Sequence, residues 1–232
     1  MRCALLIVAL LMVAGCAMAD DILAMPTANQ LKQGEVDAAA YYLKLDLPSV
    51  QPQSVNYQTL YVGLTNRIEL DVHRTDVDKD RIATVLVGSF KVLGETKVLP
   101  DLVVGCRNFT GTATSNNNPG DPTIKAKSEK ESYFVSAAKT FFANPMQPGP
   151  PLVRVHASLG TEDWTLLGQV RHRGLFGGLQ FLFRPDIGAV VANDGQDTIM
   201  GLTIMPKGSG LTIKGGGLGD HWWAGVAFRK AF

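Results

Sequence analysis

Apolar and polar residues alternate along most of this chain with a period of two. Residues 68–73 (IELDVH) place an apolar side chain at every second position and an acidic or imidazole side chain between them. Residues 153–159 (VRVHASL) and 222–229 (WWAGVAFR) repeat the alternation. Because successive side chains of a β-strand point to opposite faces, these segments predict strands with one apolar and one more polar face.

Turn residues divide the rest of the chain into further short segments of the same kind. About twelve strands are expected in all, within bounds of about ten to fourteen. An even number is typical of bacterial single-chain membrane barrels. The predicted strands are 34–46, 57–64, 67–75, 81–93, 100–111, 132–142, 152–159, 174–183, 187–193, 198–206, 211–217 and 222–230.

The connections between these strands differ in length. With strands running alternately up and down, the polar stretches 47–56, 76–80, 112–131 and 160–173 fall at one end. The other end carries mainly short turns, such as 65–66. Long loops on one side and short turns on the other are characteristic of outer-membrane barrels. The pattern therefore predicts an all-β fold, a closed antiparallel up-and-down transmembrane β-barrel.

Residues 34–232 are expected to form this barrel. Beyond the N-terminus no stretch of about 18 residues is continuously apolar, so a membrane crossing would need strands rather than helices. The last strand, 222–230, and the terminal Phe232 suit the closing strand of a membrane barrel. The expected partners are outer-membrane lipid and, through this last strand, the barrel-assembly machinery.

The N-terminus has the features of a secretion signal. Arg2 supplies a positive charge, and residues 3–14 form an apolar run of the expected length. Residues 17–19 (AMA) then offer a small-residue cleavage site. The sequence therefore predicts a signal peptide over residues 1–19 and an exported protein located in the bacterial outer membrane.

A second interpretation of the N-terminus stays open. Residues 13–16 (VAGC) resemble the lipobox of bacterial lipoproteins, which would make Cys16 the lipidated first residue of the mature chain. With either form of processing, residues 20–33 remain as an irregular lead-in. We expect this lead-in on the periplasmic side or in the mouth of the barrel.

Composition excludes some classes of function. The chain has 232 residues, enough for one barrel domain, and a formal net charge of +1. That balance gives no electrostatic reason to expect a nucleic-acid partner. No motif in the sequence predicts a metal or another cofactor.

The polar face of the strands is the expected lining of the lumen. Two interpretations follow from the charges on it: they pair with one another and fill the lumen, or they line a narrow polar passage. The candidate lumen-lining residues are Lys44, Glu69, Asp71, His73, Arg107, Arg154, His156, Lys214 and Arg229.

Two alternatives compete with a structural or narrow-pore role. His156 and Ser158 share a strand face, and a histidine base beside a serine nucleophile is the arrangement that acyl transfer needs. This pair would suit a barrel lipid deacylase, although polar-inward alternation already explains both residues. A soluble exported β-sandwich that binds a ligand is the second alternative, because alternation alone does not say whether the apolar face meets lipid or a core.

Four segments of the chain carry a family resemblance: residues 25–29 (MPTAN), 100–105 (PDLVVG), 133–139 (YFVSAAK) and 175–180 (LFGGLQ). Together they resemble a group of small bacterial outer-membrane β-barrel proteins, some of which are associated with exopolysaccharide production. The resemblance implies a barrel in the outer membrane, with envelope polysaccharide as a partner, and implies no catalytic residues. We therefore expect a structural or narrow-pore barrel in envelope or exopolysaccharide export rather than an enzyme.

Overall fold

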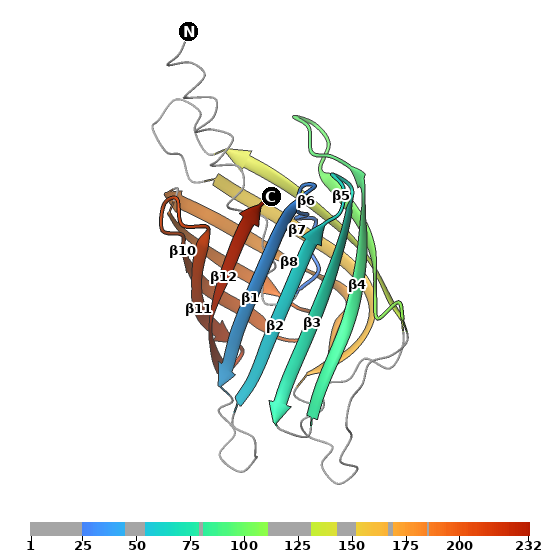
Figure 1. The fold of residues 1–232 in the computed structure, drawn as a ribbon, viewed down its shortest axis with the longest axis vertical. Helices are drawn as coiled ribbons and strands as arrows, with labels where there is room; N and C mark the ends of the chain where they lie inside the picture. The colour runs from blue at the N-terminus through green and yellow to red at the C-terminus, as the bar shows by residue number, and fades with distance from the viewer. Residues whose placement is uncertain are drawn as a thin grey trace.

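The computed structural model describes residues 25–44, 54–78, 81–110, 131–142, 152–166, 169–184 and 186–232, and these form twelve β-strands (Figure 1). Within these ranges no helix is long and apolar enough to cross a membrane. The predicted signal peptide, Cys16 and the connections 112–130 and 143–150 lie outside the described residues. The strands are β1 (Glu35–Lys44), β2 (Ser54–Gly63), β3 (Ile68–Asp78), β4 (Arg81–Leu93), β5 (Asp101–Arg107), β6 (Ser132–Phe142), β7 (Leu152–Leu166), β8 (Gln169–Arg184), β9 (Ile187–Asn193), β10 (Thr198–Ile204), β11 (Leu211–Leu218) and β12 (His221–Ala231).

The sheet is a closed barrel in which every strand pairs with its neighbours in sequence. The first and last strands complete the closure: β1 and β12 pair antiparallel from Glu35 opposite Ala231 to Lys44 opposite Trp222. The predicted fold, a closed antiparallel up-and-down barrel of twelve strands, is confirmed. The β-sandwich alternative is wrong, because one sheet closes on itself instead of two sheets packing face to face.

The two ends of the barrel differ. We call the end that carries Gly34 and Phe232 the terminal end, where the Phe232 amide donates to the Gly34 carbonyl at 2.9 Å. In Figure 1 this end lies at the top, beside the label C, and β1 runs downward from it. The opposite end, called the loop end, joins β1 to β2 and carries the turn 194–197 between β9 and β10.

The alternation of the sequence becomes the two faces of the barrel wall. Ile68 and Leu70 of β3 are each 40% exposed on the outside, and Val226 of β12 is 49% exposed. Glu69 and Asp71, the intervening residues of β3, are buried inside. On these strands the alternating apolar residues therefore face outward from a closed sheet, and the charged residues between them face its interior.

Several strands extend further than the apolar pattern predicts. The largest difference is at 160–173, which we expected to be a loop. In the structure β7 continues to Leu166 and β8 begins at Gln169, with a register shift between Thr161 and Trp164. Apolar and polar residues do not alternate cleanly in this hairpin, because its register is irregular. The two-residue period therefore did not predict these parts of the two strands. Smaller extensions bring Ser54 into β2 and Asp78 into β3.

The lead-in does not lie outside the barrel. Residues 25–33, which we call the plug, run inside the wall, and Met25 and Ala28 are completely buried. Met25 packs in an apolar cluster with Tyr41, Phe176 and other residues, while Ala28 belongs to a second cluster that includes Phe134. The interior of the barrel is thus filled partly by side chains of the wall and partly by the chain that precedes β1.

Candidate functional site

The lumen with its plug is the candidate functional site, and polar contacts secure the plug near the terminal end. The backbone amide of Leu31 donates to Glu69 of β3 at 2.6 Å. The side-chain amide of Gln30 donates to the Ser89 hydroxyl of β4 at 2.5 Å. Because Ser89 lies opposite Glu69 in the sheet, one small area of the wall holds this part of the plug.

Deeper in the lumen the wall bonds to the plug backbone. The Ser158 hydroxyl of β7 donates to the carbonyl of Pro26 at 3.1 Å, and the Ser136 hydroxyl of β6 donates to the same oxygen at 3.4 Å. The two serines are paired across the sheet and lie 2.8 Å apart, oxygen to oxygen. A backbone carbonyl buried inside the barrel therefore has hydrogen-bond partners.

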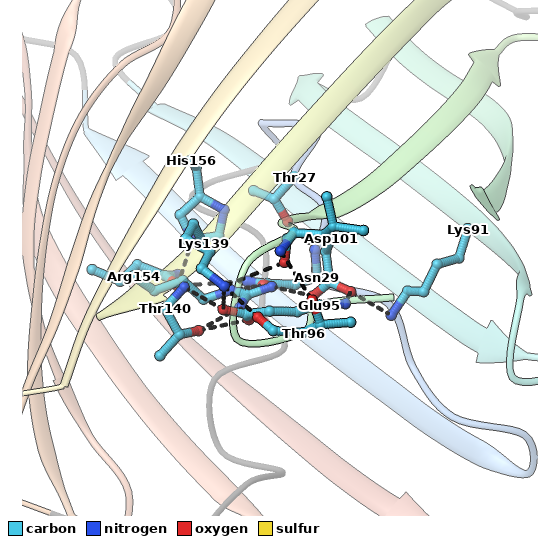
Figure 2. Close-up of polar contacts among 12 residues, drawn as sticks. Thr27, Asn29, Lys91, Glu95, Thr96, Asp101, Lys139, Thr140, Arg154 and His156 are labelled. Carbon is cyan, nitrogen blue, oxygen red and sulfur yellow. Dashed lines mark hydrogen bonds and ion pairs between the residues drawn. The ribbon is translucent and has the colours of Figure 1, made fainter. Parts of the chain in front are cut away.

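Arg154 of β7 joins the plug to the wall at the terminal end (Figure 2). Its Nε donates to the Asn29 side-chain oxygen of the plug at 2.7 Å. Its two terminal nitrogens donate to Glu95 and Asp101, each at 2.7 Å, and one also donates to Thr140 at 2.7 Å. One guanidinium thus connects the plug, the turn after β4, β5 and β6, and we call this set the Arg154 latch.

Glu95 is held in the latch from two sides. The Thr140 amide and hydroxyl donate to its carboxylate at 2.6 and 2.9 Å, and the Lys139 ammonium lies 3.5 Å away. Burial by itself raises the pKa of Glu95, but the hydrogen bonds from Thr140 and Arg154 outweigh it, so this pKa is lowered. The carboxylate is therefore stabilised in its charged form, in a turn outside the barrel strands.

The structure places most of the predicted lumen residues on the inner face. Arg229 is half-buried and donates to Asp37 of β1 at 2.7 Å, across the seam between the first and last strands. Lys214 is buried, with its ammonium over the Tyr41 ring at 5.8 Å. The remaining buried members of the predicted set are Glu69, Asp71, His73, Arg107, Arg154 and His156.

Lys44 lies on the other side of the wall from where we predicted it. It is exposed on the outer face, with its ammonium 5.9 Å from the centre of the Trp222 ring. Residues paired across neighbouring strands point to the same face, and Lys44 is paired with the outward Trp222. Its position near the loop end lets a long charged side chain reach past the apolar surface.

His156 and Ser158 share the inner face without bonding to each other. The His156 Nε2 is 2.9 Å from the Gln180 side-chain oxygen, and Ser158 bonds to Pro26 and Ser136. The hydroxyl that the acyl-transfer hypothesis needs as a nucleophile is therefore directed at the plug backbone. Nor do three or more His, Cys, Asp or Glu side chains gather as a metal site among the described residues.

A further buried arginine was not among the predicted lumen residues. Arg171 of β8 is 1% exposed, contacts Asp194 and donates to Asp197 at 2.6 Å, both in the turn after β9. It lies in the stretch that we expected to be a loop. Its neighbour His172 has a φ of +58°, which interrupts the alternation, and both side chains are buried. In the sequence, the only indication of a partner for Arg171 was the pair of acidic residues in the turn after β9.

No protein-family model matches the sequence, and no curated protein matches it. Among solved structures, the KdgM porin in complex with disordered oligogalacturonate is 11% identical, with 85% of this chain and 99% of that chain covered, at a TM-score of 0.47. The N-terminal β-barrel domain of Pseudomonas aeruginosa OprF is 12% identical, with 86% of this chain and 100% of that chain covered, at a TM-score of 0.26. At these values neither structure carries information about the function of this chain.

Proposed function

We propose that this protein is an integral outer-membrane barrel with a narrow polar lumen, and that it has no enzymatic role. The observation that supports the proposal is the orientation of the two faces of one closed sheet. Large apolar side chains are exposed on the outside, whereas charged side chains and their partners lie inside, beside a buried apolar cluster that includes Tyr41, Phe176 and Trp223. A closed barrel satisfies every backbone group within the sheet, which is the condition for crossing a membrane by strands.

Aromatic residues near the two ends of the outer surface support the same proposal. Tyr42 and Trp222 lie near the loop end with ring centres 5.7 Å apart, and both are exposed. Phe90, Phe141 and Phe228 are exposed near the terminal end. Aromatic side chains on either side of an apolar band are typical of the two interfaces of a membrane.

The interior favours a narrow passage over a wide pore. Arg154, Arg171 and Arg229 each bond to carboxylates, so these three arginines contribute little unpaired positive charge to the lumen. The plug occupies part of the remaining cross-section. Such a lumen suits a structural barrel or a small, controlled passage, and the family resemblance adds envelope or exopolysaccharide export as its proposed setting.

Replacing outward apolar residues with arginine tests the membrane assignment. Leu70→Arg puts a charge in the apolar band, whereas Val98→Arg puts the same charge in the turn after β4, where Val98 is already 84% exposed. Because Leu70 lies between the middle of the band and the interface near Phe90, we expect Leu70→Arg to reduce the free energy of folding into lipid vesicles by about 1–2 kcal/mol and Val98→Arg to leave it nearly unchanged. Vesicle insertion and heat-dependent gel mobility measure both.

The contrary outcome is equally specific. If the purified chain remains folded in water without detergent, and neither arginine variant changes its folding, the outer surface does not face lipid. In planar bilayers, the proposal predicts that the wild-type protein inserts and has low conductance.

A further inference from the structure

We propose that the plug is displaceable, and that the Arg154 latch holds a passage through the barrel closed. The inference rests on the proposed membrane function and deepens it, because it assigns gating to residues 25–33. The barrel is then neither a solid structural body nor a permanently open pore. The released form would expose a polar route on the side of the lumen that the plug now occupies.

The bonds that hold the plug are of a kind that can exchange. Residues 26–34 are not part of any strand, although Gly34 leads directly into β1. The plug instead donates separate hydrogen bonds to side chains of β3 and β4 and accepts them from side chains of β6 and β7. Hydroxyl, amide and guanidinium partners of this type can be replaced by water, whereas the continuous pairing of the wall must break cooperatively.

The chain has a turn where the plug meets the wall. Gly34 has a φ of +79°, a conformation that favours glycine, and its amide donates to the Gly63 carbonyl at 2.9 Å. A Cβ at Gly63 would lie 2.0 Å from the carbonyl oxygen of Lys32. Gly63 therefore has no side chain at the point where the plug crosses the rim of the barrel, and the backbone of Lys32 fits closely against it.

The wall beside the plug is already polar. A small cavity lies between Pro26, Thr27 and Asn29 of the plug and the inner face of β3, β4 and β5. The wall side of that cavity is lined by Glu69, Asp71, His73, Ser89 and Arg107, together with the apolar residue Val87 and with Phe134 of β6. Withdrawal of the plug would enlarge this polar space, and it would also uncover the apolar wall residues that cluster with Met25 and Ala28. The polar cavity gives water a place to enter beside the plug.

A thiol placed in the plug tests release directly. Thr27 is 5% exposed, and Thr27→Cys keeps nearly the same side-chain volume. In the full chain in detergent, with Cys3, Cys16 and Cys106 all replaced by serine, a water-soluble maleimide reports how often the plug leaves the lumen. Asn29→Ala removes the plug side of the latch, and Arg154→Ala removes the wall side. We expect each to speed labelling roughly tenfold, the effect of losing one charge-assisted hydrogen bond.

Arg171→Ala is the matched control, because it removes another buried arginine that bonds to two aspartates of the wall. It is expected to leave labelling unchanged, provided that the variant keeps its heat-dependent mobility. Gly63→Val is a second way to expel the plug, and it leaves Arg154 intact. The proposal is wrong if the Asn29, Arg154 and Gly63 variants are labelled as slowly as the chain that carries Thr27→Cys alone. It is also wrong if Thr27→Cys is already labelled rapidly without any of these substitutions.

Conductance separates this inference from the proposed function. In planar bilayers, Asn29→Ala and Gly63→Val should raise the conductance above that of the wild type. If these variants insert and label rapidly but do not conduct, the displaced plug does not open a passage, and the inference fails while the membrane barrel stands. Failure of every variant and of the wild type to insert would instead remove the membrane function.

Discussion

Two buried arginines, Arg154 and Arg171, make similar bonds for different purposes. Arg171 bonds to Asp194 and Asp197, and Asp194 also accepts from the amides of Gln196 and Asp197, so the whole group belongs to adjacent parts of the wall. Arg154 bonds to carboxylates of the wall and also to Asn29 of the plug. An arginine whose partners all belong to the wall connects parts of the wall, whereas Arg154, through its hydrogen bond to Asn29, also holds the plug inside it.

The largest expected effect is on the stability of the wall. Arg171→Ala leaves the Asp194 carboxylate, whose side chain is 4% exposed, without its guanidinium. Removing one partner of a buried pair is expected to lower the free energy of unfolding by about 3–5 kcal/mol, measured by urea titration in detergent micelles.

Arg184→Ala is the matched surface change. The Arg184 Nε lies 3.0 Å from the Asp186 Oδ1, and the two side chains are 67% and 37% exposed. We therefore expect Arg184→Ala to lower the free energy of unfolding by less than about 1 kcal/mol. Equal losses for the two variants would show that burial does not distinguish these pairs.

A double-mutant cycle gives the next largest effect and sharpens the comparison. Asn29→Ala and Arg154→Ala remove the two sides of one hydrogen bond, so their effects on the free energy of unfolding should be coupled by about 1–3 kcal/mol. Asn29→Ala and Arg171→Ala share no bond among the contacts described here and should be additive within about 0.5 kcal/mol. Coupling of equal size in both cycles would contradict a latch specific to Arg154.

The smallest effect is expected from pH. The pKa of Glu95 is lowered from an ordinary value of 4.5, so its stabilising contribution is complete above that value and is lost as the pH falls through the lowered pKa. Labelling of Thr27→Cys, divided at each pH by that of an exposed Val98→Cys control to remove the pH dependence of thiol reactivity, should therefore rise modestly below about pH 4.5, since Glu95 is partly exposed and solvent weakens the effect.

Glu95→Gln supplies the control for this pH dependence. The amide is uncharged at every pH in this range, so the same ratio of labelling to the Val98→Cys control should be nearly independent of pH in that variant. A pH dependence that persists in Glu95→Gln would assign the effect to another group.

The pattern of side chains determined most of the barrel in advance. A two-residue period is a property of the extended backbone, so the segments around Ile68 and Val226 had to become strands with a distinct outer face. Where the backbone is irregular, the alternation is lost and does not show which face a side chain occupies. Around His172, whose φ is +58°, neighbouring side chains no longer alternate, and Arg171 could not be assigned to a face.

Only the tertiary structure decided what the inner face touches. Pairing across the seam put Lys44 beside the outward Trp222, although its charge suggested the lumen. Closure of the sheet brought Asn29 to Arg154, 125 residues later in the chain, and so placed the lead-in inside the barrel. Alternation reports the direction of a side chain relative to its own strand, but it contains no information about which distant segment will meet that side chain once the sheet has closed.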